Sequence, residues 1–196
     1  ILLLPVSAQA AISLTVSGDG VSNPRTFSEA DLLDMELVQQ QYSTINTWPT
    51  KKMIVAQGVR LSDILEQAGI TDEAKLIKVK SRDGFVISFT VQQLLDDTRY
   101  FYPGLKENHE YFGYINGSEA GASPVPTIIA LKSAESTDFG HMNDKEAPLL
   151  VLGQRWISEQ TNQVFVKMIT DIEVSTSQPG KWDKPTFSPS VGEVPV

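Results

Sequence analysis

The helical patterns in this chain are all short. Ser28 and Asp31 form a capping-box pattern ahead of a helix of about two turns. Thr90 and Gln93 repeat that pattern, and Ser62 is expected to cap a further short helix. A crossover between parallel strands needs about a dozen residues or more, so these helices are too short for regular βαβ units. The chain is therefore expected to fold as a mixed α+β domain and not as a doubly wound parallel sheet.

Strand patterns outnumber the helical ones. The clearest is a hairpin, in which runs of β-forming residues at 75–80 and 85–89 flank the turn sequence SRDG. Its Asp-Gly pair supplies the positive φ that a tight turn needs. Further strands are expected at 11–16, 53–56, 111–115, 127–131, 148–152 and 164–174.

The length and composition of the chain suit a single core. It has 196 residues, of which 41% are hydrophobic and 20% are charged, and such values are typical of one globular domain. We expect residues 11–176 to form that domain. The stretch 177–196 is rich in proline and has no apolar period, so it is expected to be a tail or a linker.

The first ten residues, ILLLPVSAQA, resemble the end of a secretory signal with an Ala-Gln-Ala cleavage site. The alternative is that residues 1–10 hold an apolar strand of a longer chain. Both interpretations predict an extracytoplasmic protein of bacterial type, which is secreted, periplasmic or on the cell surface. No apolar run reaches the roughly 18 residues that a membrane span needs.

Charge and cysteine content exclude several classes of function. The chain is acidic, with 16 Lys and Arg against 24 Asp and Glu and a net charge of −8. A nucleic-acid or anionic-membrane partner held by basic residues is therefore not expected. The chain is also free of cysteine, which excludes disulfides, thiolate-bound zinc or iron–sulfur clusters, c-type haem attachment and a cysteine nucleophile.

Few residues in the sequence point to catalysis. There is no Gly-x-Ser-x-Gly elbow and no phosphate-binding glycine loop, and no catalytic residue is assigned. His109 lies in a polar stretch and is expected to be a solvated loop residue. His141 lies near Asp138, Asn143 and Asp144, whose oxygens suit a hard cation, although a plain polar loop is the favoured interpretation.

Aromatic residues leave a second alternative open. Three tryptophans and four tyrosines could build a surface on which a ligand stacks, namely Trp48, Trp156, Trp182, Tyr100, Tyr102, Tyr111 and Tyr114. The other interpretation is that Tyr111 and Tyr114 are core and edge residues of one strand.

Five segments of the chain carry a family resemblance through their order. They are 58–69 (GVRLSDILEQAG), 81–85 (SRDGF), 114–117 (YING), 147–153 (APLLVLG) and 166–174 (VKMITDIEV). In this order they resemble motifs of the oxidoreductase molybdopterin-binding domain of the sulfite oxidase family, over about residues 11–176. The resemblance implies a mixed multi-sheet, sulfite-oxidase-type molybdopterin-binding fold with short helices.

The same resemblance implies one pterin-bound molybdenum that catalyses oxygen-atom transfer or a related two-electron step. It also implies a cysteine thiolate ligand just before the 58–69 segment, where this chain has YSTINTW at 42–48. A hydroxyl is a harder and weaker donor than a thiolate. Lys145 and Glu146 stand where the family has His-Gly, and Leu150 replaces an arginine. Glu146 would repel a pterin pyrophosphate unless a cation intervened.

These departures favour a retained fold with a degenerate or repurposed site. No metal ligand is assigned, and no cofactor is expected. The former cofactor cleft is then the candidate surface for a small-molecule ligand or a protein partner. Its expected lining, which is also the expected cofactor-binding set, is Ser43, Thr44, Asn46, Trp48, Lys145 and Arg155.

Three hypotheses follow for the function. The favoured one is a non-catalytic extracytoplasmic ligand-binding or interaction module. The second is an active molybdopterin-dependent oxidoreductase whose metal is bound by Ser43, by Thr44 or by no protein group. The third is an unrelated fold, such as a carbohydrate-binding or surface-layer-associated domain that uses the aromatic residues.

Overall fold

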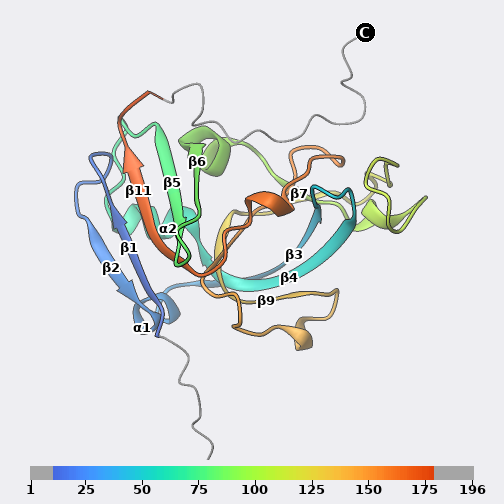
Figure 1. Cartoon of the computed structure of the whole chain (residues 1–196), viewed down its shortest axis with the longest axis horizontal. Helices are drawn as coiled ribbons and strands as arrows, with labels where there is room; N and C mark the ends of the chain where they lie inside the picture. Colours follow the sequence, from blue (N-terminus) through green and yellow to red (C-terminus); the bar gives the residue numbers. More distant parts are fainter. Residues whose placement is uncertain (1–10, 179–196) are drawn as a thin grey trace, which may run out of the picture.

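The computed structural model of the chain describes residues 11–178. Two main β-sheets dominate it, and Figure 1 shows the five-stranded sheet on the left and the four-stranded sheet on the right. The expected leader at 1–10 and nearly all of the expected tail at 177–196 lie outside the described residues. Between residues 11 and 178, no helix is long and apolar enough to cross a membrane.

The five-stranded sheet joins the two ends of the described chain. Its order is β2-β1-β11-β5-β6, and β1 pairs with β11 in parallel while the other pairs are antiparallel. The strands are β1 (Ser13–Ser17), β2 (Arg25–Ser28), β5 (Leu76–Ser81), β6 (Val86–Thr90) and β11 (Ile169–Ser175). The predicted hairpin is confirmed as β5 and β6, with Gly84 at a positive φ of 88° in its turn.

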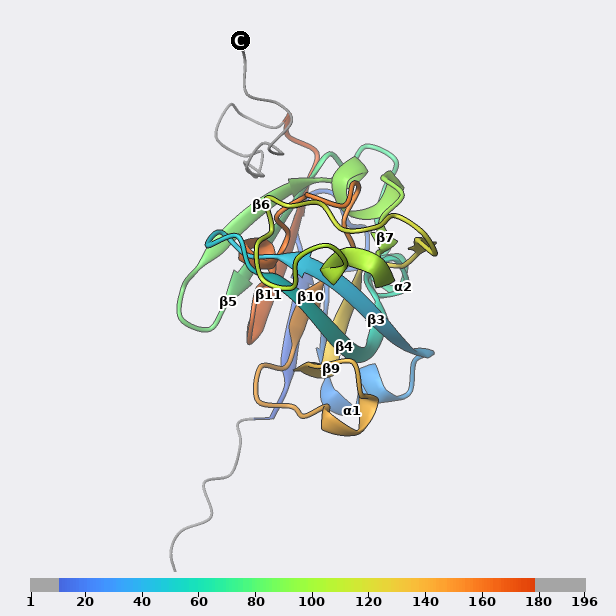
Figure 2. The same cartoon turned by 90° about the vertical axis from the view of Figure 1, so that its right-hand side faces the viewer.

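The four-stranded sheet is antiparallel and has the order β10-β9-β4-β3. Its strands are β3 (Leu37–Ile45), β4 (Lys51–Arg60), β9 (Ile128–Glu135) and β10 (Leu149–Val151). In Figure 2, β3 and β4 run across the front of the molecule. A two-stranded sheet of β7 (Tyr100–Phe101) and β8 (Ser123–Pro124) completes the set.

The helical elements are as short as their sequence patterns predict. They are α1 (Glu29–Leu33), α2 (Leu61–Gln67), the π-helical turn η1 (Gln92–Asp96) and the 3₁₀ turns η2 (Pro103–Lys106), η3 (Phe139–His141) and η4 (Asn162–Val164). Mixed sheets with few, short helices confirm the α+β expectation at this level.

Two of the three predicted helix caps are confirmed. Ser28 and Asp31 form the reciprocal bonds of a capping box at α1. The amide N–H of Thr90 donates to Gln93 at 2.9 Å, and the N–H of Gln93 donates to the Thr90 hydroxyl at 3.1 Å. The Ser62 prediction is wrong, because α2 begins at Leu61 and the Ser62 hydroxyl donates to the Asp63 carboxylate.

The main core draws on both large sheets and on α2. It includes Leu14 and Ile172 of the five-stranded sheet, Ile129 of the four-stranded sheet and Leu65 of α2, all with 0% exposure. A second cluster surrounds Tyr42, and a smaller third one surrounds Ile45 and Tyr102. Burial of these apolar groups is the main force that holds the sheets together.

The strand predicted at 111–115 is wrong. This segment makes a single bridge, from Phe112 to Thr50, and the Gly113 N–H donates to the Pro49 carbonyl at 2.6 Å. Tyr111 is 62% exposed and Tyr114 is 46% exposed, so neither is a core residue. The predicted strand at 164–174 is shorter than expected, because β11 begins only at Ile169.

Candidate functional site

Ser43 and Thr44 lie near the end of β3 and are both 0% exposed. The Ser43 hydroxyl accepts a hydrogen bond from the Tyr102 N–H at 2.9 Å. The Thr44 hydroxyl shares a 2.6 Å hydrogen bond with the Thr161 hydroxyl. Because neighbouring side chains of a strand point to opposite faces, these two oxygens do not line one cleft.

This geometry does not fit a metal-ligand role for either residue. Both hydroxyl oxygens are buried and already bonded within the protein, and a hydroxyl is a poor ligand while its proton stays on. Within residues 11–178, no group of three or more His, Cys, Asp and Glu side chains could hold a metal ion. The binding role that the sequence motifs suggest for these residues remains a prediction.

Asn46 and Trp48 lie in the turn that joins β3 to β4. The Asn46 side-chain oxygen accepts from the Thr50 N–H at 2.9 Å and so closes the turn. Trp48 is 85% exposed at the tip of that turn. Neither residue lines the cavity described below, so the structure does not gather the six predicted residues around one cleft.

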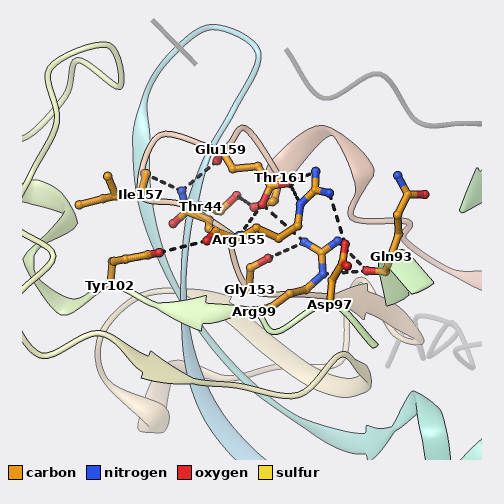
Figure 3. Close-up of polar contacts among 11 residues, drawn as sticks. Thr44, Gln93, Asp97, Arg99, Tyr102, Gly153, Arg155, Ile157, Glu159 and Thr161 are labelled. Carbon is orange, nitrogen blue, oxygen red and sulfur yellow. Dashed lines mark hydrogen bonds and ion pairs between the residues drawn. The ribbon is translucent and has the colours of Figure 1, made fainter. Parts of the chain in front are cut away.

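Arg155 belongs to a buried ion-pair cluster, which Figure 3 shows. Its guanidinium contacts Glu159 Oε1 through Nε at 2.8 Å and through Nη2 at 2.7 Å. Nη1 lies 3.3 Å from Asp97 Oδ2, and the guanidinium packs over the Trp156 ring at 4.7 Å from its centroid. Because Glu159 is 0% exposed, Arg155 serves to neutralise a buried carboxylate.

Arg99 is the second arginine of the cluster, and its side chain is 1% exposed. Nε and Nη2 donate to the Gln93 carbonyl, at 3.0 and 2.7 Å, while Nη1 donates to the Gly153 carbonyl at 3.0 Å. Nη1 also lies 3.6 Å from Glu159 Oε2. Burial lowers the pKa of Arg99 to about 10, so the group stays charged at neutral pH. The cluster thus fastens η1 to the segment after β10.

Sequence reasoning missed Arg99 and Glu159. Neither residue lies in a recognisable motif, and 60 positions of chain separate them. The one signal that could have indicated their pairing is burial, because an arginine or a glutamate is almost never fully buried unless it is paired. The sequence pattern around these residues does not predict that burial.

Lys145 lines a cavity of about 320 Å³. The walls come from β4, β9, the segment around Lys145 and the segment 162–167. Three side chains form an apolar wall, Ile54, Leu149 and Phe165. One of the predicted site residues, Lys145, therefore lines a cavity that is large enough for a small molecule.

The charged groups of this cavity are mostly paired. Lys52 contacts Glu135 at 2.8 Å, and Lys167 forms an ion pair with Glu146. The Lys145 side chain has no ion-pair or hydrogen-bond partner among the described residues. The Glu146 carboxylate is thus compensated by Lys167 of the same chain.

Leu150 does not face this cavity. It is 0% exposed and belongs to the main core, whereas its neighbour Leu149 on β10 lines the cavity. The alternation of side chains along the strand explains this difference. The position at which the family resemblance implies an arginine is here a core position.

The two histidines lie in loops. His109 is not simply solvated, because its Nδ1 accepts from the Tyr111 N–H at 3.3 Å and its ring stacks on Phe112 at 4.3 Å between centroids. His141 Nδ1 lies 2.9 Å from the Ser136 hydroxyl. Asp138 accepts from the Gly140 N–H at 2.8 Å, so its carboxylate closes this loop. These contacts agree with the favoured interpretation of 138–144 as a polar loop.

Several exposed aromatic rings gather beside the β3–β4 turn. The Phe112 ring stacks on Tyr114 at 5.1 Å between centroids, in addition to its contact with His109. The Lys51 N–H donates to the Tyr111 carbonyl at 3.1 Å, which ties the 109–115 segment to β4. Of the aromatic residues that the sequence alternative names, Tyr111 and Tyr114 are exposed here, whereas Tyr102 is 5% exposed, Trp156 packs against Arg155 and Trp182 lies outside the described residues.

Comparisons with known proteins bear on the fold. No protein-family model matches the chain, and no curated protein matches it. Among solved structures, the chain is similar to the sulfane dehydrogenase SoxCD from Paracoccus pantotrophus, with a TM-score of 0.54 and 16% sequence identity. The similarity covers 84% of this chain and 38% of that chain.

This likeness shows the fold alone. It supports, at a distance, the sulfite-oxidase-like fold that the five sequence motifs predict. The chain spans well under half of the SoxCD chain that it matches. The likeness does not define an activity for this chain, because one fold carries many functions.

Proposed function

We propose that this domain is a ligand-binding module on a sulfite-oxidase-like fold, and that it binds a small molecule in the cavity around Lys145. The observation that carries the proposal is the cavity itself. Its volume of about 320 Å³ lies at the lower end of the range for small-molecule sites. It also combines an apolar wall with a few polar groups, which is the usual make-up of such sites.

The state of Ser43 and Thr44 favours binding over molybdenum-dependent catalysis. Each hydroxyl would have to leave a buried hydrogen bond before it could reach a metal. Breaking such a bond leaves its partner unsatisfied, which costs about 1–3 kcal/mol. Arg155 is likewise held by Glu159 and Asp97, so it is not available to an anionic cofactor without a rearrangement.

We also propose that the protein works outside the cytoplasm. The signal-like sequence at 1–10 supports this location. The test is fractionation of the native host with an antibody against residues 11–178. Recovery of the protein with cytoplasmic markers would contradict the proposal.

Metal and pterin analysis of protein purified from its native host tests the ligand-binding proposal against the enzyme alternative. We expect no stoichiometric molybdenum and no pterin fluorophore after oxidation. Stoichiometric amounts of both would overturn the proposal.

A fragment screen by ligand-observed NMR tests the cavity directly. Ala134 lines the cavity and is half-buried, so Ala134→Trp is expected to fill the space and abolish binding. Ala122 is exposed and does not line the cavity, which makes Ala122→Trp the matched control. Circular dichroism of both variants checks that they fold. Fragments that bind wild type and Ala134→Trp equally, or no fragment hits at all, would contradict the proposal.

A further inference from the structure

We infer that the ligand of the Lys145 cavity is an organic anion, with an acidic headgroup at Lys145 and an apolar body against Ile54, Leu149 and Phe165. This inference rests on the proposed function, because it names the chemical class of ligand for the same cavity. The charge of the cavity excludes a cation, its free donors match a carboxylate, and its size and apolar wall favour an organic ligand over an inorganic ion.

The charge of the cavity differs in sign from that of the chain. The whole chain has a net charge of −8, yet three lysines and two glutamates line this cavity. Two of the lysines are compensated by direct contact with the two glutamates. Lys145 is then the uncompensated charge, and it attracts an anion while it repels a cation.

Two further donors are available beside Lys145. Ser133 and Asn162 line the same cavity, and neither the Ser133 hydroxyl nor the Asn162 side-chain amide has a hydrogen-bond partner among the described residues. Ser133 is 8% exposed, and its hydroxyl can donate to a ligand oxygen. A carboxylate has two oxygens with about four acceptor sites, which matches a set made of one ammonium, one hydroxyl and one amide.

The size and the apolar wall favour an organic ligand over an inorganic ion. With about 30 Å³ of liquid volume per water molecule, a cavity of about 320 Å³ has room for about ten non-hydrogen atoms. A sulfate or phosphate ion would occupy only part of this space and would leave the apolar wall in contact with water. An organic acid fills both the polar and the apolar part.

A matched set of compounds with one apolar body tests the headgroup. The probes are 3-phenylpropionate, 3-phenylpropanamide and 3-phenylpropylamine, with sodium sulfate as the inorganic anion. Binding is measured by two-dimensional NMR titration of wild type, Lys145→Gln and Lys145→Arg. Lys132→Gln is the matched control, because Lys132 is an exposed lysine on β9 that does not line the cavity.

We expect 3-phenylpropionate to bind wild type at least about tenfold more tightly than the amide or the amine. Lys145→Gln should lose about tenfold in affinity for the acid, whereas Lys145→Arg and Lys132→Gln should stay within about twofold. Affinity for the acid should also fall with rising salt concentration, because a charge pair at the mouth of a cavity is screened.

The outcomes separate this inference from the proposed function. Equal binding of acid, amide and amine, lost in Ala134→Trp, would overturn the inference and leave the ligand-binding proposal standing. Unchanged affinity of Lys145→Gln for the acid, or binding of sulfate as tight as that of 3-phenylpropionate, would also overturn the inference. If none of the probes binds, the inference fails, and the fragment screen decides the proposed function by itself.

Discussion

Replacing Thr44 by valine is expected to lower the free energy of unfolding by about 2 kcal/mol. Thr44 and Thr161 are both 0% exposed, and their hydroxyls are 2.6 Å apart. Valine keeps the shape of the side chain but removes the oxygen, so the Thr161 hydroxyl is left buried without its partner. A buried unsatisfied group costs about 1–3 kcal/mol, which is more than the roughly 1 kcal/mol net value of the hydrogen bond.

The double variant distinguishes a shared hydrogen bond from two independent losses. With Thr44→Val and Thr161→Val together, no orphaned hydroxyl remains, so the total loss is expected to be about 1 kcal/mol or less. Urea denaturation followed by circular dichroism gives the free energies by linear extrapolation. Thr137→Val is the control, because Thr137 is exposed and should change the free energy by less than about 0.5 kcal/mol.

Two results would refute this reasoning. A loss below about 0.5 kcal/mol for Thr44→Val would mean that this side chain lies in an open cleft, as the sequence motifs suggested. A double variant whose loss equals the sum of the single losses would mean that the two hydroxyls do not share a bond.

Three further predictions concern the buried side chains of Arg99 and Lys51 and the close contact at Gly58. Arg99→Met should cost about 3 kcal/mol or more in urea denaturation, since it removes one side of the buried pair with Glu159, and a loss below about 1 kcal/mol would contradict this. Burial lowers the pKa of Lys51 from 10.5 in the folded chain. Between the lowered pKa and pH 10.5, the unfolded chain therefore binds more protons than the folded chain. The contribution of Lys51 to stability rises with pH in that range. The difference in unfolding free energy between wild type and Lys51→Met should therefore shift in favour of wild type as the pH rises towards 10.5, whereas a flat difference would count against the burial of its charge. Gly58→Ala should lower the melting temperature and cost about 2 kcal/mol or more, because its Cβ would lie 2.0 Å from the Ile129 carbonyl oxygen, and an unchanged melting temperature would disprove that contact.

The parts of the fold that the sequence predicts well are local. The capping box of Ser28 and Asp31 involves residues three positions apart, so one short segment contains all of its partners. The hairpin around Gly84 is similar, because its turn chemistry is carried by adjacent residues. The strand expected at 111–115 failed for the opposite reason, since β-forming residues there make one bridge and no ladder with a neighbour.

The candidate site was predicted less well because burial and long-range pairing decide it. The motif order assigned Ser43 and Thr44 to the candidate site, but whether their hydroxyls are open depends on Tyr102 and Thr161, which are distant in sequence. Lys145 was identified from its departure from the family pattern, and it does line a cavity. The two ion pairs beside it join residues that are distant in sequence, and no local pattern contains such contacts.

The parallel pairing of β1 with β11 has a mechanical consequence. Ser13 begins β1 at one end of the sheet, and Ser175 ends β11 at the other end, so a pulling force applied at these two residues acts along the strands in opposite directions. The hydrogen bonds between the two strands are then loaded in shear and share the force, instead of opening one after another. This sheet should therefore resist stretching along the chain more strongly than a hairpin that is pulled apart from its open end.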